Sequence, residues 1–166
     1  MFSNIQRIDF EFHSLCNRSC EWCPNSFISR GKENFLDLNV FKNIIQELYD
    51  NNFSTKYYYN GAFKTGAIIS FLGYQEPLMQ VDELKKYIKI IKDIFVDRNV
   101  VILTNSNGDL FSEENLQDLN LSILNIMDYD CQGKEYWKKK LKENKCILIN
   151  DSGYILSAIH KNINLI

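Results

Sequence analysis

Three cysteines near the N-terminus are the residues best suited to chemistry in this sequence. Cys16, Cys20 and Cys23 have the spacing Cys-x3-Cys-x2-Cys, so a flexible loop could bring all three thiolates to one centre. Soft thiolate ligands select iron–sulfur clusters or zinc. A structural zinc site needs four ligands, and the nearest candidate for a fourth, His13, is expected to lie on a strand. A cubane cluster held by three cysteines keeps one iron open, so the spacing favours a catalytic cluster over zinc or incidental thiols.

A second candidate segment, Gly73-Tyr74-Gln75-Glu76-Pro77-Leu78, follows an apolar run at 67–72. Gly73 lets the backbone turn sharply and approach a ligand, and Pro77 restricts the exit from the turn. Glu76 offers a carboxylate at the end of the expected strand. An ordinary strand-to-helix turn with a solvated Glu76 is the alternative interpretation.

Two further polar segments follow the next expected strands. Asn105 belongs to Thr104-Asn105-Ser106-Asn107-Gly108, which is either a ligand-binding loop or a common polar turn. Asp128 and Asp130 follow a strand expected at 122–127, where they either contact a ligand or cap the positive end of the next helix.

The elements that must position these segments alternate between strands and helices. Strands are expected at 5–13, 67–72, 100–104 and 122–127, and helices at 37–52, 81–97, 112–119 and 134–144. Two more strand-like segments, 146–150 and 154–160, are joined by a tight turn, and 53–66 is expected to be a loop or a small hairpin. This alternation predicts an α/β fold of four to five βα units with a mainly parallel sheet. All the candidate segments then lie at the carboxyl edge, where such sheets place their sites.

The first expected strand has a charged face of Arg7, Asp9, Glu11 and His13. A strand that is covered on both sides is usually apolar on both faces. These side chains are therefore expected either to line an open lumen or to form an internal ion-pair network.

Length and composition favour one domain over 1–166. The chain has 166 residues, 45% of them hydrophobic and 24% charged, which is ordinary for a globular protein and too short for a complete eight-fold barrel of roughly 250 residues. The net charge of −2 gives no general attraction for nucleic acid, and no apolar run could cross a membrane. An odd count of five cysteines argues against a disulfide framework and for metal or redox chemistry. The N-terminus does not resemble a secretion signal, so a cytoplasmic protein is expected. Cys131 and Cys146 are expected to be core residues.

The cysteine segment resembles the signature of the radical S-adenosylmethionine (SAM) enzymes, Cys-x3-Cys-x2-Cys with an aromatic residue before the last cysteine, here Trp22. The resemblance implies a partial (βα) barrel, open on one side, in which the three cysteines ligate a [4Fe-4S] cluster. It places Trp22 near the adenine of SAM. Gly73, Tyr74, Glu76 and Pro77 resemble the family's Gly-Gly-Glu-Pro motif, which holds the SAM ammonium group, although Gln75 stands where glycine is common. Asn105 and Asp128 are further SAM contacts by the same resemblance.

The function implied is reductive cleavage of SAM to a 5′-deoxyadenosyl radical, which abstracts hydrogen from an unidentified substrate. An electron donor such as flavodoxin or ferredoxin is implied as a partner. The chain is shorter than the six-unit barrel of the family, so a partner chain or a further C-terminal segment is expected to complete it. The alternative from another class is a non-catalytic remnant that binds an iron–sulfur cluster or zinc and acts as a partner subunit. A redox protein using Cys20 and Cys23 alone would leave Cys16 unexplained.

Overall fold

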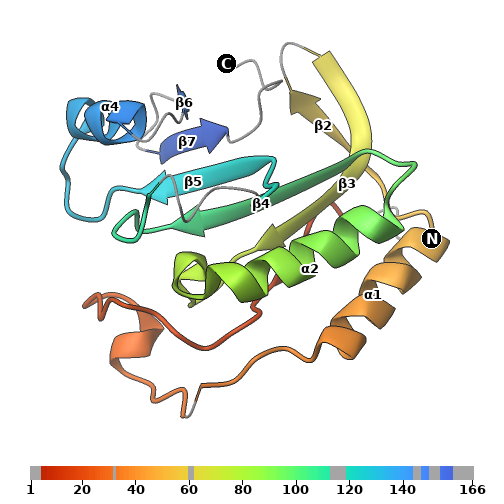
Figure 1. Ribbon diagram of the computed structural model, residues 1–166, viewed down its shortest axis with the longest axis horizontal. Coiled ribbons are helices and arrows are strands. Elements are labelled where there is room, and N and C mark those ends of the chain that lie inside the picture. Colours follow the sequence, from red (N-terminus) through yellow and green to blue (C-terminus); the bar gives the residue numbers. More distant parts are fainter. Residues whose placement is uncertain are drawn as a thin grey trace.

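The computed structural model describes residues 5–31, 33–59, 62–112, 119–143, 147–149 and 154–158. Its centre is a seven-stranded sheet, in which six strands have the order β1-β3-β4-β5-β7-β6 and the seventh, β2, pairs with β3 (Figure 1). Four strands run parallel, namely β1 (Ile8–Phe10), β3 (Ala62–Phe71), β4 (Val100–Ser106) and β5 (Ile123–Met127). The sheet does not close on itself, so the expected partial barrel with a mainly parallel sheet is confirmed.

The remaining strands are antiparallel additions. At one end, β7 (Tyr154–Ala158) pairs with β5 and then with β6 (Ile147–Ile149). Elsewhere, β2 (Thr55–Tyr59) pairs with the first half of β3, so of the loop and the small hairpin expected at 53–66 the structure shows the hairpin. The second strand is therefore longer than the expected 67–72, because its first residues pair with β2 outside the core. The four parallel strands are thus followed in the chain by the antiparallel pair of β6 and β7.

Two amphipathic helices, α1 (Leu38–Asp50) and α2 (Val81–Ile94), lie side by side against one face of the sheet (Figure 1). The side chain of Asp37 caps α1 by accepting hydrogen bonds from the N–H groups of Asn39 and Val40, each at 2.9 Å. A third helix, α4 (Lys134–Glu143), follows β5 as expected. The helix expected at 112–119 and the residue Cys146 lie largely or wholly outside the described residues. Cys131, which was expected in the core, is exposed, so that prediction was wrong.

Aromatic packing between the helices and the sheet forms the centre of the core. Phe10 of β1 and Tyr87 of α2 both pack edge-on against Phe41 of α1, with ring centroids 4.8 and 5.0 Å apart. Phe12 and Phe71 are fully buried in the same cluster. Because aromatic side chains bury large apolar areas, this cluster fixes the ends of β1 and β3, from which two of the candidate segments leave the sheet.

The first strand is much shorter than the expected 5–13. Its pairing with β3 ends at Phe10, opposite Phe71, because the chain then turns toward a side chain instead of a neighbouring strand. Gln75 supplies that contact: its Oε1 accepts hydrogen bonds from the N–H groups of Phe12 and His13, and its Nε2 donates to the carbonyl of Phe10. Of the four residues on the charged face of the expected strand, His13 is only 2% exposed. It packs against the rings of Phe12 and Phe35 and does not line an open lumen.

Parallel pairing brings the carboxyl ends of β1, β3, β4 and β5 to one edge of the sheet. The loops that follow these strands therefore lie next to one another, although they are far apart in the sequence. Two short 3-10 helices stand in these loops, η1 (Pro24–Ser26) after the cysteines and η2 (Pro77–Gln80) before α2. No helix in the described part of the chain is both long and apolar enough to cross a membrane.

Candidate functional site

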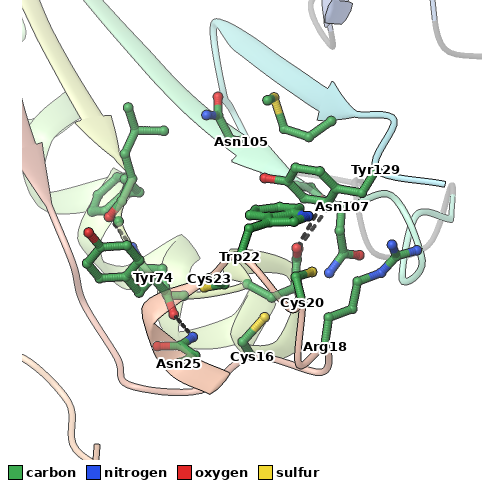
Figure 2. A pocket seen from close by; sticks show the side chains of 17 residues that line it. Cys16, Arg18, Cys20, Trp22, Cys23, Asn25, Tyr74, Asn105, Asn107 and Tyr129 are labelled. Carbon is green, nitrogen blue, oxygen red and sulfur yellow. Dashed lines mark hydrogen bonds between the residues drawn. The ribbon is translucent and has the colours of Figure 1, made fainter. Parts of the chain in front are cut away.

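The loops at the carboxyl edge enclose one shallow pocket of about 90 Å³ (Figure 2). Its walls come from the segments after all four parallel strands. The residues from the first and second loops are Cys16, Arg18, Cys20, Trp22, Cys23, Asn25, Leu72, Gly73, Tyr74, Gln75 and Glu76. Those from the other strands and loops are Phe71, Asn105, Ser106, Asn107, Met127 and Tyr129. The sequence-based prediction that these distant segments meet at one edge is thus matched by the geometry.

The three cysteines lie on a loop in which backbone hydrogen bonds form consecutive tight turns. The Cys23 N–H donates to the Cys20 carbonyl at 2.8 Å, and the Ser26 N–H donates to the Cys23 carbonyl at 2.9 Å, where Pro24 begins η1. All three thiols are free and half-buried, and all three border the pocket (Figure 2). Burial raises the pKa of the Cys16 thiol, and the charges of Glu76 and the two neighbouring cysteines raise it further, while a hydrogen bond with the Arg18 backbone opposes the rise.

The donor set can be compared with the two groups that three thiolates could hold. Among the described residues, no three His, Cys, Asp or Glu side chains are arranged to hold a single metal ion. A tetrahedral zinc ion draws all its ligands onto one centre, whereas each thiolate of a cubane cluster binds a different iron. The three thiols that border the pocket supply the soft donor atoms that either group would need. The cluster itself stays a prediction.

Glu76 is 2% exposed and holds the loop after β4. One of its carboxylate oxygens accepts from Ser106 Oγ and the other from the backbone N–H of Asn107, both at 2.8 Å. The Leu78 N–H donates to the same side chain at 3.2 Å. Burial raises the pKa of Glu76, while the hydrogen bonds from Asn107, Ser106 and Leu78 oppose that rise. The structure thus excludes the alternative in which Glu76 is a solvated turn residue.

Gly73 and Gln75 shape the same segment. Gly73 has a φ of +114°, and a Cβ at this position would lie 2.9 Å from the carboxylate of Glu11. Glu11 is held there by a paired contact with Arg30, at 2.7 and 2.8 Å, and by the N–H of Tyr74. Gln75 satisfies all its amide hydrogen-bonding capacity on backbone groups, which explains how the chain tolerates it where glycine is common.

Two aromatic side chains stand together at the pocket. Trp22 and Tyr129 have ring centroids 4.8 Å apart at an interplanar angle of 54°, and they are 63% and 41% exposed. Figure 2 shows both rings over the three cysteines. Burial raises the pKa of the Tyr129 hydroxyl, and the nearby cysteines and Glu76 raise it further. Large exposed aromatic rings of this kind offer flat apolar faces to a planar ligand.

The other predicted site residues divide into two groups. Asn105 lines the pocket from within β4, where its Oδ1 accepts from Asn125 Nδ2 at 2.8 Å. Pro77 is buried at the start of η2, and Asp128 does not line the pocket. The Asp128 carboxylate instead accepts from the N–H groups of Gln132 and Gly133, at 2.9 and 2.8 Å, just before α4. This geometry favours the capping interpretation of Asp128 over a cofactor contact.

The sequence analysis did not identify Arg18, Tyr129 or Gln75 as residues of the candidate site. Arg18 lies inside the cysteine segment, and its guanidinium forms ion pairs with Asp109 and Asp130. Asp130 was predicted from the sequence as a possible ligand contact, but its carboxylate instead accepts hydrogen bonds from the Arg18 guanidinium. A lone arginine between two cysteines carries no signal for such partners, because they come from loops more than ninety residues away.

Comparisons with known proteins agree with this geometry. The chain matches no protein-family profile. It is 30% identical over 112 residues to the S-adenosyl-L-methionine-dependent 2-deoxy-scyllo-inosamine dehydrogenase of Niallia circulans. The aligned region covers 68% of this chain and 39% of that protein. The similarity in sequence is therefore to an enzyme that uses SAM.

Two solved structures of BtrN share the fold. The complex of BtrN with AdoMet and 2-DOIA gives a TM-score of 0.59 at 24% identity, covering 74% of this chain and 46% of BtrN. BtrN in an open conformation gives 0.57 at 24% identity, covering 75% and 50%. The chain thus spans half or less of the length of each of these proteins. These structural matches show that the chain shares the fold of BtrN over about three quarters of its length.

Proposed function

We propose that this chain is a radical SAM enzyme in which Cys16, Cys20 and Cys23 hold a [4Fe-4S] cluster and the adjoining pocket receives SAM. When bound and reduced, the cluster supplies one electron that breaks a carbon–sulfur bond of SAM, giving methionine and a 5′-deoxyadenosyl radical that takes a hydrogen atom from the substrate. The observation that carries the proposal is that all three thiols border one pocket whose other walls follow β3, β4 and β5.

The chain's own residues supply binding and orientation. The faces of Trp22 and Tyr129 suit a purine ring, and the Asn105 amide offers hydrogen bonds from the pocket wall formed by β4. Glu76 already accepts three hydrogen bonds, two at Oε1 and one at Oε2, so its Oε2 retains one acceptor position for an ammonium group. Its first task is then to keep the loops after β3 and β4 together around the cofactor.

The substrate and the electron donor extend the proposal. The name of the Niallia circulans relative makes a dehydrogenation one candidate outcome, in which the substrate radical left by hydrogen abstraction would pass one electron to a one-electron acceptor and release one proton. A small flavodoxin or ferredoxin is the class of donor that fits a one-electron requirement.

The test is the formation of 5′-deoxyadenosine. The full chain is reconstituted with iron and sulfide without oxygen, given SAM and dithionite, and the products are separated by liquid chromatography. Wild type should release 5′-deoxyadenosine and methionine, and Cys20→Ser should not. Cys131→Ser is the matched control, because Cys131 is an exposed free cysteine that does not line the pocket. A bound cluster that yields no product would favour the non-catalytic alternative.

A further inference from the structure

One arginine fastens the cysteine loop across the edge of the sheet. Arg18 Nε and Nη2 donate to Asp109 at 2.6 and 2.5 Å, and Arg18 Nη1 and Nη2 donate to Asp130 at 2.9 and 2.6 Å. Asp109 belongs to the loop after β4 and Asp130 to the loop after β5. Since β3 and β4 separate β1 from β5 in the sheet, the arginine reaches over two strands from the loop that follows β1.

The contact of Arg18 with the two aspartates differs from an ordinary surface ion pair. Isolated exposed pairs contribute little, but a planar guanidinium that meets carboxylates through paired hydrogen bonds is both stronger and geometrically specific. The Arg18 side chain is 18% exposed, against 37% and 52% for Asp109 and Asp130. The guanidinium holds the pKa of Asp109 below its usual range.

A neighbouring residue joins this contact to the wall of the pocket. Asn17 Nδ2 donates to Asp109 at 3.2 Å, and Asn17 Oδ1 accepts from Asn107 Nδ2 at 2.8 Å. The backbone N–H of Asn107 donates in turn to Glu76. One continuous polar network therefore runs from the cysteine loop to the loops after β3, β4 and β5.

The cysteine loop depends on such contacts because it has little regular structure of its own. Between His13 and η1 no residue lies in a helix or strand. The chain there is fixed by a few turns and by side chains that reach other loops. Positions held in this way open more readily than positions within a sheet.

We infer that Arg18 is a positioning residue that, through Asp109 and Asp130, holds the Cys16–Cys23 loop across the sheet edge so that the three thiols face one pocket. The inference rests on the proposed function for its purpose, but the fastening itself is a property of the chain without any cofactor. It assigns to Asp109 and Asp130 a role in loop placement instead of in direct contact with SAM.

Hydrogen exchange of the apo chain, followed by mass spectrometry, measures the fastening directly. Arg18→Gln removes the paired hydrogen bonds, so amides in segment 14–23 should exchange about tenfold faster, the effect expected for lost charge-assisted bonds. Arg30→Gln is the matched control, since Arg30 follows the same loop but pairs with Glu11 beside β1. It should leave exchange in 14–23 unchanged. Asp109→Asn combined with Asp130→Asn should reproduce Arg18→Gln, and adding Arg18→Gln to that pair should have no further effect.

Iron bound at limiting iron supply then tests the purpose of the fastening. Arg18→Gln should bind several-fold less iron than wild type, Arg18→Lys should recover part of the loss, and Arg30→Gln should bind as wild type does. Unchanged exchange in Arg18→Gln would overturn the fastening. Faster exchange with unchanged iron binding would overturn the positioning role. If wild type itself binds no iron, the proposed function fails together with the positioning role, while the exchange data still decide whether Arg18 fastens the loop.

Discussion

The buried carboxylate of Glu76 accepts a hydrogen bond from Ser106 Oγ at 2.8 Å, which links the loop after β3 to the end of β4. Its other oxygen accepts from the N–H of Asn107. The residue that the sequence offers as a cofactor contact is therefore also a structural link between two walls of the pocket. Changes at Glu76 should affect stability as well as cofactor binding.

Glu76→Gln should lower the free energy of unfolding by about 1–3 kcal/mol, because an amide cannot accept all three hydrogen bonds that the carboxylate accepts. Denaturant unfolding of the apo chain measures the change. Glu83→Gln on α2 is the control, since Glu83 makes an ion pair with Lys86 on the helix surface and should cost less than about 0.5 kcal/mol. Equal stabilities of the two variants would contradict the role given to Glu76.

Gly73 and Gly31 separate backbone strain from steric conflict. Both have positive φ, +114° and +75°, but a Cβ on Gly73 would lie 2.9 Å from the Glu11 carboxylate, whereas a Cβ on Gly31 would have no atom within 4 Å. Gly31→Ala should cost about 1 kcal/mol from its backbone conformation alone. Gly73→Ala should cost at least about 2 kcal/mol, because Glu11 must also move. Thermal unfolding of the two variants checks the difference, and a smaller loss for Gly73→Ala would refute the packing described.

His13 should make the stability of the apo chain depend on pH. Burial lowers the pKa of His13 to about 4, from an ordinary value of 6.5, while its Nδ1 accepts from the Leu15 N–H at 2.9 Å. Between these pH values the unfolded chain binds a proton that the folded chain does not. The contribution of His13 is therefore complete above pH 6.5 and falls by up to about 3 kcal/mol as the pH drops toward 4.

The variant His13→Asn keeps a hydrogen-bond acceptor for Leu15 but cannot titrate. Its free energy of unfolding should fall less than that of wild type between pH 7 and pH 4.5, whatever the absolute stability of the variant. Parallel pH profiles for the two proteins would show that His13 is not held neutral by the fold.

Trp22 should contribute to SAM binding through its ring. Trp22→Ala removes one of the two aromatic faces at the pocket and should weaken SAM binding by about tenfold, the effect of a lost aromatic contact. Phe27→Ala is the control, because Phe27 is 75% exposed and does not line the pocket. Isothermal titration of the reconstituted protein with SAM measures both affinities. If both variants bind as wild type does, the purine does not lie on this ring.

Local patterns predicted the helices well. Asp37 caps α1, and Phe41, Ile45 and Leu48 form its buried stripe, because a cap and a helical period are written in neighbouring residues. The position of the cysteine loop and the Glu76 segment at the carboxyl edge was also predictable, since each follows a strand and carries distinctive residues.

Contacts between distant loops could not be predicted in the same way. The end of β1 depends on the amide of Gln75, and the position of the cysteine loop depends on Arg18 meeting Asp109 and Asp130. Each partner is polar and ordinary in its own segment, and it becomes informative only when the sheet order is known. Asp128 shows the converse: a local capping geometry was open as an alternative, and the structure favours it.

The most direct measurement of the central claim is the iron and acid-labile sulfide bound by wild type, Cys16→Ser, Cys20→Ser, Cys23→Ser and Cys131→Ser after anaerobic reconstitution. Wild type and Cys131→Ser should each bind about four irons and four sulfides per chain, with the electron paramagnetic resonance spectrum of a reduced cubane cluster that changes when SAM is added. Each variant of the triple should lose most of this iron. Equal iron in all five proteins, or zinc with no iron in wild type, would contradict the assignment of Cys16, Cys20 and Cys23 as cluster ligands.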